Sequence, residues 1–418
     1  MPLMSVGENP EMSESIKNLT LSRLQSRMSM DETGIGRLPR AQEAIHHGIL
    51  EGTHLGAQLR VSLHGETVAE AAFGESRPGA PLTRDHLMLW LSSSKPVAAV
   101  AIGQLWERGR LELDDSVATH IPEFAQNGKD GITLRHLLTH TGGIRMLDVG
   151  WPGATWDEIL ARICGMKPEP RWIPGEKAGY HLASSWFVLG EVIRRVDGRP
   201  FETYVREEIF CPLGMRDSWI GMPADRYATY RAEDRIAVMW NTEKTPPESY
   251  GWETEERCTR PHPGGNGYGP LHELSRFYEM LLGRGSYQGR RLLLPQTVDL
   301  FTSRQREGMI DATFKHPLDW GLGFILNSNH YGADTVPYGY GHHASSPTFG
   351  HSGNRSSTAF ADPEHQLVVA LAFNGLPDNE RHEHRIRAVL DAIYEDLGLA
   401  GRQSGHRARS AGSSSSIR

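Results

Sequence analysis

Strand-like segments lie at both ends of this chain, and patterns typical of helices fill the middle. Residues 56–63 and 66–73 alternate apolar and polar side chains on either side of His64-Gly65, which predicts a two-residue hairpin. Further strands are predicted at residues 321–327, 356–361 and 366–374. Helical spacing of apolar residues is found at 38–50, 96–108, 134–140, 184–196, 201–210, 271–282 and 385–397. This order predicts an α+β fold: an antiparallel sheet built from both ends and flanked by helices, with an inserted, mostly helical subdomain.

The same order predicts one large domain at residues 35–400 rather than a string of separate domains. We expect its α/β part at about 35–115 and 286–400, and its helical part at about 116–285. A pocket is expected where the two parts meet.

The two ends of the chain lie outside this predicted domain. Residues 1–34 show little periodicity and are expected to form a variable N-terminal arm, whereas residues 401–418 are low in complexity and are expected to be a disordered tail. No run approaches the roughly 18 apolar residues of a membrane helix, and residues 1–34 lack the apolar core of a secretory signal. We therefore expect a cytoplasmic protein that does not contact a membrane.

The composition argues against several classes of function. The net charge is −7, from 44 basic and 51 acidic residues, whereas nucleic-acid binding needs a basic face. The cysteines (Cys164, Cys211 and Cys258) are far apart and odd in number, so neither a disulfide framework nor a cysteine metal site is predicted. The chain has 20 histidines, and the densest groups, His342-His343 and His382-Glu-His384, lack the helical i, i+4 spacing typical of zinc sites. We expect no metal, no cofactor and no nucleic-acid partner, and the oligomeric state stays open.

The strongest local signal for chemistry is the segment Trp90-Leu-Ser92-Ser-Ser-Lys95-Pro96. A serine and a lysine three residues apart at a helix start lie on one face, where hydroxyl and amine can meet. Burial would favour the neutral amine, which can accept the serine proton, and the helix N-terminus would favour a developing oxyanion. An N-capping serine beside a solvated lysine would also fit the tetrapeptide. However, no other lysine in the chain has a serine three residues before it.

Two weaker signals follow. Tyr180 lies in the loop before the predicted helix 184–196, and its phenol could project into a cleft. Beside an ammonium group such a phenol is drawn towards phenolate and could act as a general base. The segment Phe349-Gly-His351-Ser-Gly353-Asn354 precedes a strand, and its glycines allow a ligand to approach the backbone closely. Taken singly, a packed tyrosine and a structural histidine are the simpler explanations.

Together, the three signals resemble the serine β-lactamase and penicillin-binding-protein-like hydrolases. The order Ser92-x-x-Lys95, Tyr180 and then His351-x-Gly353 is similar to the order of the family's motifs, and so are their separations. The nearest branch is the class C β-lactamase-related one, which includes carboxylesterases, D-amino-acid peptidases and acyltransferases. The resemblance covers roughly residues 36 to 399 and implies the β-lactamase/transpeptidase-like fold.

The resemblance also implies a role for each matching residue. Ser92 would be the nucleophile that becomes acylated, Lys95 would tune and shuttle protons, and Tyr180 would activate first Ser92 and later the deacylating water. His351 stands where many relatives have lysine. The backbone N–H groups of Ser92 and Asn354 correspond to the family's oxyanion hole.

Two departures from the family pattern bear on the substrate. Leu182 occupies the place where β-lactam-hydrolysing relatives usually have an asparagine that donates to a substrate amide. His351 does not provide a permanent cation for a substrate carboxylate, because histidine titrates near neutrality. Both departures favour a small-molecule ester or acyl donor, so we expect a serine hydrolase that cleaves carboxylic esters through an acyl-serine intermediate. The alternative is an acyltransferase of specialised metabolism with the same residues. A β-lactamase, a D-amino-acid peptidase or a catalytically silent binding relative is less favoured.

Overall fold

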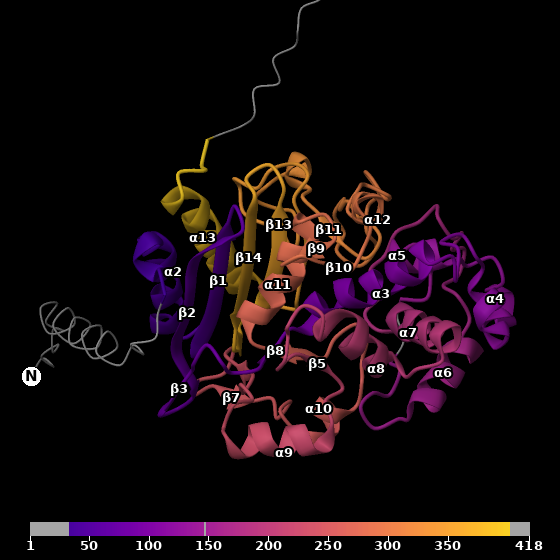
Figure 1. Cartoon of the computed structure of the whole chain (residues 1–418), viewed down its shortest axis with the longest axis horizontal. Helices are drawn as coiled ribbons and strands as arrows, with labels where there is room; N and C mark the ends of the chain where they lie inside the picture. The colour runs from indigo at the N-terminus through magenta and orange to yellow at the C-terminus, as the bar shows by residue number, and fades with distance from the viewer. Residues whose placement is uncertain (1–32, 146–147, 402–418) are drawn as a thin grey trace, which may run out of the picture.

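The computed structural model describes residues 33–145 and 148–401, and its centre is a seven-stranded sheet in the order β11-β12-β13-β14-β1-β2-β3 (Figure 1). The strands are β1 (Gly56–Leu63), β2 (Glu66–Arg77), β3 (Ala80–Pro81), β11 (Ile325–Leu326), β12 (Phe349–Ser352), β13 (Ser357–Asp362) and β14 (Leu367–Phe373). All neighbouring strands are antiparallel. β1 pairs with β14 from Ala57 opposite Phe373 to Leu63 opposite Leu367. The α+β fold with a sheet built from both ends of the chain is therefore confirmed.

The predicted hairpin is present, whereas only the end of the predicted strand 321–327 forms a strand. His64 and Gly65 join β1 to β2 with φ angles of 53° and 79°, the left-handed pair that a two-residue turn requires. The strand 321–327 is reduced to Ile325–Leu326, because the chain turns tightly just before it. In that turn the Gly321 N–H donates to the carbonyl of Phe324, and Gly323 has a φ of 82°.

Helices cover both faces of the sheet because its central strand is apolar on both sides. Along β14, Leu367 and Val369 belong to one hydrophobic cluster, and the intervening Val368 belongs to another. The first cluster packs against α2 (Pro39–Leu50) and α13 (Asn379–Asp396), and the second packs against α3 (Lys95–Glu107) and α11 (Leu271–Leu282). The sheet is therefore the middle layer of three.

The position of α11 differs from the expected division of the chain. The sequence places this helix in the helical part, up to residue 285, whereas α11 packs on β1, β13 and β14 (Figure 1). Its buried face includes Leu274, Phe277 and Leu281, which follow helical spacing. By these contacts, the helix lies against the sheet, although the sequence places it in the helical part.

The helical part packs beside the sheet, with α7 against α3. Its helices are α4 (Val117–His120), α5 (Leu134–Leu138), α6 (Trp156–Gly165), α7 (Ser184–Asp197), α8 (Phe201–Val205), α9 (Ala224–Ala232) and α10 (Glu255–Thr259). Short helical turns are η1 (Ile35–Arg37), η2 (Leu91–Ser94), η3 (Pro122–Gly128), η4 (Arg206–Phe210) and η5 (Asn329–Tyr331). The predicted helix 201–210 is thus divided into α8 and the wider turn η4.

Small sheets join the helical part to the part that contains the seven-stranded sheet. A three-stranded sheet has the order β4 (Met88–Leu89), β8 (Gly267–Gly269) and β5 (Trp219–Ile220). Another consists of β15 (Gly375–Leu376), β6 (Trp240–Asn241) and β7 (Glu248–Ser249). The hairpin β9 (Ser286–Tyr287) and β10 (Arg290–Arg291) precedes α12 (Pro295–Phe301).

At the N-terminal end, Thr33 already pairs with Glu70 of β2, so the sheet contacts begin within the expected arm. Residues 1–32 and 402–418, where most of the arm and the tail were expected, lie outside the described residues. Among the described helices, none combines the length and the apolar character needed to cross a membrane.

Candidate active site

Ser92 lies in a tight turn at the start of the long helix α3. The turn is the 3₁₀ segment η2, and Lys95 begins α3 directly after it. Leu91, just before Ser92, has a φ of 49°, in a region that branched residues rarely adopt. Because a 3₁₀ helix has three residues per turn, Ser92 and Lys95 lie one above the other. The expected placement of the two side chains on one face is therefore present.

Hydrogen bonds hold this turn against strands that are distant in the sequence. The Ser93 hydroxyl donates to the carbonyl of His351 at 3.0 Å. The Ser357 hydroxyl donates to the carbonyl of Trp90 at 2.5 Å. The position of Ser92 thus depends on the end of β12 and the start of β13.

The side chain of Lys95 is completely buried, and its amine contacts Ser92. Lys95 Nζ lies 2.9 Å from Ser92 Oγ and donates to the carbonyl of Gly264 at 2.7 Å. It also lies 5.1 Å from the centroid of the Tyr180 ring. Burial lowers the pKa of Lys95 well below its ordinary value, and no carboxylate of the described residues opposes this effect. A neutral amine keeps a lone pair, which can accept the proton of the Ser92 hydroxyl.

Tyr180 enters the site from the segment before α7. Its ring is buried, with centroid distances of 4.7 Å to His140 and 5.2 Å to Phe314. Within the described chain, no group forms a hydrogen bond of ordinary geometry with its hydroxyl, although Ser92 is near enough to lower the pKa of the phenol. Burial outweighs this effect and raises the pKa of Tyr180 well above its ordinary value. Burial therefore opposes the phenolate expected from the sequence.

A buried ion pair positions the backbone of Tyr180. Asp311 accepts from the backbone N–H of Tyr180 at 3.1 Å and from that of Thr313 at 2.8 Å. The carboxylate also pairs with the Arg306 guanidinium at 3.1 Å, and both side chains are buried. Arg306 in turn donates to the carbonyl of Thr139 at 3.0 Å. This pair is not predictable from the sequence, because only tertiary contacts bring it to Tyr180 and no local pattern marks it.

Two buried histidines, also not predicted from the sequence, support the same tyrosine. The His140 ring lies 4.4 Å from the Trp320 ring, and its Nδ1 accepts from the backbone N–H of His181 at 2.9 Å. Burial lowers the pKa of both histidines, to about 3 for His181, so both are neutral. His140 ends the predicted helix 134–140 and His181 directly follows Tyr180, but neither position indicated a role.

The end of β12 brings Gly353 against the Ser92 turn. A Cβ atom at Gly353 would lie 2.5 Å from the carbonyl oxygen of Trp90, so only glycine permits this approach. Asn354 follows in the exposed turn towards β13. In the part of the chain described, its backbone N–H donates to no acceptor. An available N–H beside the Ser92 turn fits the oxyanion position that the resemblance implies.

His351 lies on β12, opposite Ala359 of β13. Its Nδ1 donates to the carbonyl of Ser352 at 2.8 Å, and because a carbonyl can only accept, Nδ1 carries the proton. Burial, reinforced by Lys95, lowers the pKa of His351 well below its ordinary value. The ring is therefore neutral, and its Nε2 presents a buried lone pair without a partner in the described structure. His351 supplies no fixed positive charge where many relatives have lysine.

A cavity of about 350 Å³ lies beside the Tyr180 segment, lined by Trp172, Glu176, Lys177, Ala178, Met309, Ile310, Ala312 and Lys315. Ile310 is 67% exposed, and Leu182, two residues after Tyr180, is 55% exposed. Ile310 therefore gives the cavity an exposed apolar border, and Leu182 is a further exposed apolar side chain of the segment that carries Tyr180. In the described residues, no group of three or more His, Cys, Asp or Glu side chains is arranged to hold a metal ion.

Comparison with known proteins agrees with this fold. The β-lactamase family model matches residues 40–394, and the chain belongs to this family. Esterase EstB from Burkholderia gladioli is 27% identical over 319 residues, which cover 68% of this chain and 78% of that protein. A family VIII carboxylesterase structure is 25% identical with a TM-score of 0.73, over 88% of this chain and 100% of the other. A penicillin-binding protein homologue from Caulobacter crescentus is 30% identical with a TM-score of 0.70, over 87% of this chain and 100% of that protein.

These similarities define the class of the protein. It is a serine hydrolase with the β-lactamase/transpeptidase-like fold, as the resemblance in the sequence implied.

Proposed function

We propose that this protein hydrolyses carboxylic esters of small molecules through an acyl intermediate on Ser92. The observation that carries the proposal is the contact between Ser92 Oγ and the buried amine of Lys95, whose pKa is lowered by burial. A neutral amine can take the serine proton, whereas an ammonium group cannot. Similarity to EstB and to a family VIII carboxylesterase supports an ester as the substrate.

Acylation of the enzyme needs one proton transfer to Lys95 and one away from it. Ser92 Oγ attacks the carbonyl carbon as its proton moves to Lys95 Nζ, and the carbonyl oxygen becomes an oxyanion beside the N–H groups of Ser92 and Asn354. The ester C–O bond then breaks. The departing alkoxide takes the phenol proton of Tyr180, and the Lys95 ammonium group returns a proton to Tyr180. The products are acyl-Ser92, a free alcohol and a neutral Lys95.

Deacylation follows the same path in the opposite direction. Water attacks the acyl carbon, and its proton passes through Tyr180 to Lys95. The bond between the acyl carbon and Ser92 Oγ breaks, Oγ regains its proton from Lys95, and the carboxylic acid leaves. The raised pKa of Tyr180 suits a phenol that gives and receives a proton within one step.

Two residues favour esters over β-lactams and peptides. The neutral His351 offers no fixed charge to a substrate carboxylate. The side chain of Leu182 has no group that could donate to an amide carbonyl or accept from an amide N–H. A neutral ester needs neither interaction, and its apolar part could occupy the cavity beside Ala178, which Met309 and Ile310 also line.

Acyl transfer to an alcohol or amine is the second candidate. The same residues would carry it, with the acceptor in place of water. The exposed Leu182 and Ile310 favour it, because an apolar border lets an organic acceptor compete with water. An ester assay with an added alcohol distinguishes the two, since a transferase forms the new ester in preference to the free acid.

The test is hydrolysis of a short-chain p-nitrophenyl ester by the wild type and by Ser92→Ala, with labelling by a fluorophosphonate and intact-mass measurement. We expect turnover and a single adduct for the wild type, and neither for the folded variant. Equal turnover by both proteins would reject Ser92 as the nucleophile. A folded wild type that neither turns over the ester nor forms an adduct would instead support a catalytically silent binding protein.

A further inference from the structure

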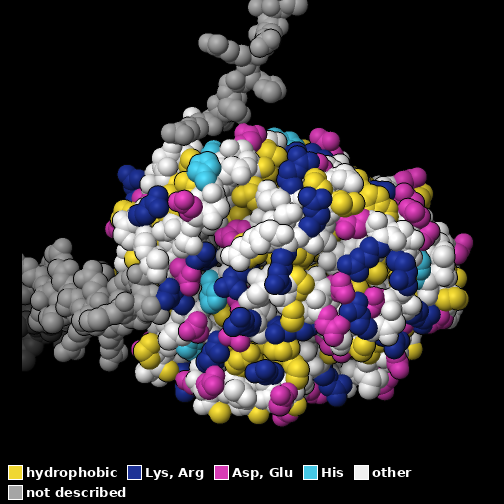
Figure 2. Space-filling view, viewed as in Figure 1, with side chains coloured by type: hydrophobic (Ala, Val, Ile, Leu, Met, Phe, Trp, Pro, Cys, Tyr) yellow, Lys and Arg dark blue, Asp and Glu magenta, His cyan; other side chains and the backbone are white. Residues whose placement is uncertain are grey.

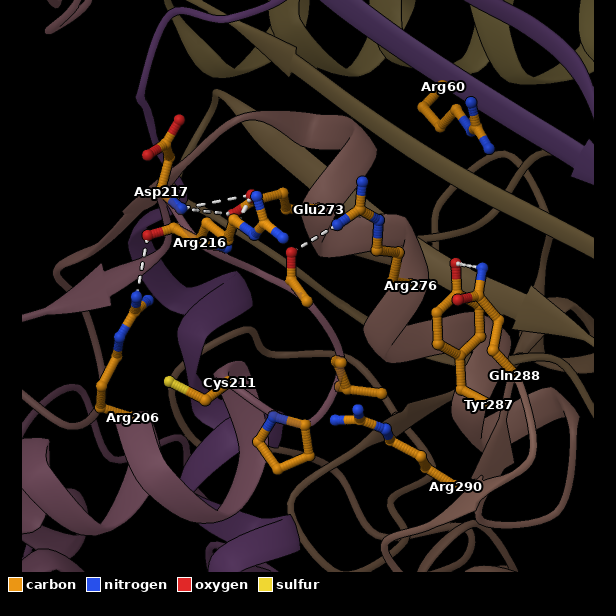
Figure 3. A pocket seen from close by; sticks show the side chains of 13 residues that line it. Arg60, Arg206, Cys211, Arg216, Asp217, Glu273, Arg276, Tyr287, Gln288 and Arg290 are labelled. Atoms are coloured by element: carbon orange, nitrogen blue, oxygen red, sulfur yellow. Dashed lines mark hydrogen bonds between the residues drawn. The ribbon is translucent and has the colours of Figure 1, made fainter.

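A cavity of about 980 Å³ opens on the face that carries α11 (Figure 3). It lies between α11, the β9–β10 hairpin and the loop after η4, and it shares no lining residue with the Ser92 site. The arginines that line it are Arg60, Arg206, Arg216, Arg276 and Arg290. They come from five separate segments of the chain, so the fold brings these positive charges together around one concave surface.

Among the described residues, only one of these arginines forms direct ion pairs. Arg60 pairs with Glu70, and with Glu279 at 4.0 Å. The Arg276 guanidinium donates to the carbonyl of Gly214 at 2.6 Å, and Arg206 likewise donates to backbone carbonyls. Within residues 33–145 and 148–401, no carboxylate lies at ion-pair distance from the other four guanidinium groups. Because each guanidinium has five N–H donors, these contacts leave donors available for a ligand.

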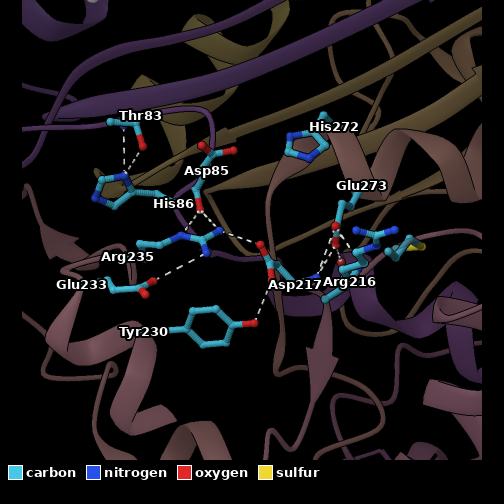
Figure 4. Close-up of polar contacts among 12 residues, drawn as sticks. Thr83, Asp85, His86, Arg216, Asp217, Tyr230, Glu233, Arg235, His272 and Glu273 are labelled. Carbon is cyan, nitrogen blue, oxygen red and sulfur yellow. Dashed lines mark hydrogen bonds and ion pairs between the residues drawn. The ribbon is translucent and has the colours of Figure 1, made fainter. Parts of the chain in front are cut away.

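The carboxylates that line the cavity are already engaged. Asp217 pairs with Arg235 at 2.6 Å and accepts from the Tyr230 hydroxyl at 2.8 Å (Figure 4). Glu273 is buried and accepts from two backbone N–H groups and from the Ser218 hydroxyl at 2.7 Å. The cavity therefore keeps an excess of positive charge, although the whole chain has a net charge of −7.

We propose that this cavity binds an organic ligand that carries a chain of phosphate groups. Guanidinium groups match phosphate oxygens in bidentate geometry, and four of them around one space need several anionic groups to balance them. The volume is at the upper end of ordinary ligand pockets, which suits a molecule of nucleotide size. Leu213 and Tyr287 add apolar surface for the organic part. Figure 2 shows Lys and Arg side chains gathered in the centre of this face.

The test is calorimetric titration of the full-length protein with inorganic tripolyphosphate at about 0.15 M ionic strength, where exposed charges are screened beyond about 8 Å. Arg290→Glu is the main variant, and Arg291→Glu is its matched control. Both residues are exposed in β10, but only Arg290 lines the cavity, because successive side chains of a strand point to opposite faces. Arg216→Gln is a second variant on an exposed side chain of another segment.

We expect saturable binding at one site by the wild type, by Arg291→Glu and by Ser92→Ala. In Arg290→Glu and Arg216→Gln, the dissociation constant should rise about tenfold or more, because a bidentate contact is lost. Absence of saturable binding by the wild type would overturn the proposal. So would equal affinities of Arg290→Glu and Arg291→Glu, or loss of binding in Ser92→Ala. Ester hydrolysis should be unchanged in Arg290→Glu, so this test stands apart from the proposed activity.

Discussion

The side-chain nitrogen of Lys95 lies 2.9 Å from Oγ of Ser92, at a position with no exposure to solvent. An unfolded lysine has a pKa of about 10.5 and is charged at neutral pH, whereas burial lowers the pKa of Lys95 in the folded protein. Between the lowered pKa and 10.5, the unfolded state therefore binds more protons than the folded state. Stability should rise with pH across this window, by at most about 1.4 kcal/mol per pH unit for this one group.

The first prediction follows from this linkage. Lys95→Met has no amine that can titrate, so the pH-dependent contribution of Lys95 to stability is absent from the variant. The free energy of unfolding of the wild type should therefore increase relative to that of the variant as pH rises from 7 to about 9.5. Urea denaturation of both proteins at several pH values measures the difference. Lys244→Met is the control, since Lys244 is exposed and pairs with Glu248, and its difference should stay constant. A constant difference for Lys95→Met would mean that the folded protein holds Lys95 charged.

The second prediction concerns the phenol of Tyr180. Tyr180→Phe should lower kcat by roughly 10²- to 10⁴-fold, the usual range for a proton-transfer group. Its melting temperature should change little, because the hydroxyl makes no hydrogen bond of ordinary geometry in the described structure. Steady-state kinetics and thermal denaturation check both statements. The control Tyr204→Phe removes a hydroxyl that donates to Gln104 at 3.2 Å in the helical part, and it should leave kcat unchanged. A decrease in kcat of less than tenfold in Tyr180→Phe would indicate that Lys95 alone carries the proton transfers.

The third prediction concerns the close approach of β12 to the Ser92 turn. Gly353→Ala places a Cβ against the carbonyl of Trp90, so the turn must shift and activity should fall by about 10²-fold, as for other small displacements of reacting groups. Gly131→Ala is the matched control, because Gly131 is exposed and its added Cβ would meet no atom within 4 Å. Equal kcat values for the two variants would show that the turn tolerates the shift.

The fourth prediction concerns the buried pair of Asp311 and Arg306. Asp311→Ala leaves Arg306 buried without its partner and should lower the free energy of unfolding by about 3–5 kcal/mol. The exposed pair of Asp299 and Arg284 serves for comparison, and Asp299→Ala should cost about 1 kcal/mol or less. Chemical denaturation measures both values. A cost below about 1 kcal/mol for Asp311→Ala would show that solvent reaches the pair.

The fifth prediction concerns substrate choice. Leu182→Asn places an amide group two residues after Tyr180 and should raise the ratio of amide or β-lactam turnover to ester turnover. Leu182 is 55% exposed, so the change should cost little stability. Leu50→Asn, on α2 with 46% exposure, is the control for a general effect of the substitution. An unchanged ratio in Leu182→Asn would assign the ester preference to another residue.

Local patterns in the sequence determined several features correctly. The spacing of Ser92 and Lys95 placed the two side chains on one face, because three residues make one turn of a 3₁₀ helix. His64-Gly65 set the first hairpin, because two left-handed residues suit a two-residue turn. The predicted strand at 366–374 is present as β14, whose continuous apolar run is buried on both sides of the sheet. Each feature depends on neighbours within a few residues.

Only the tertiary structure decided the charge states of the site. Burial sets the pKa shifts of Lys95, Tyr180 and His351, and the atoms that bury each group come from many segments far apart in the chain. The support of Tyr180 by Asp311 and the convergence of arginines in the large cavity have the same origin. Desolvation and long-range contacts depend on how the whole chain packs, and no short stretch of sequence contains that information.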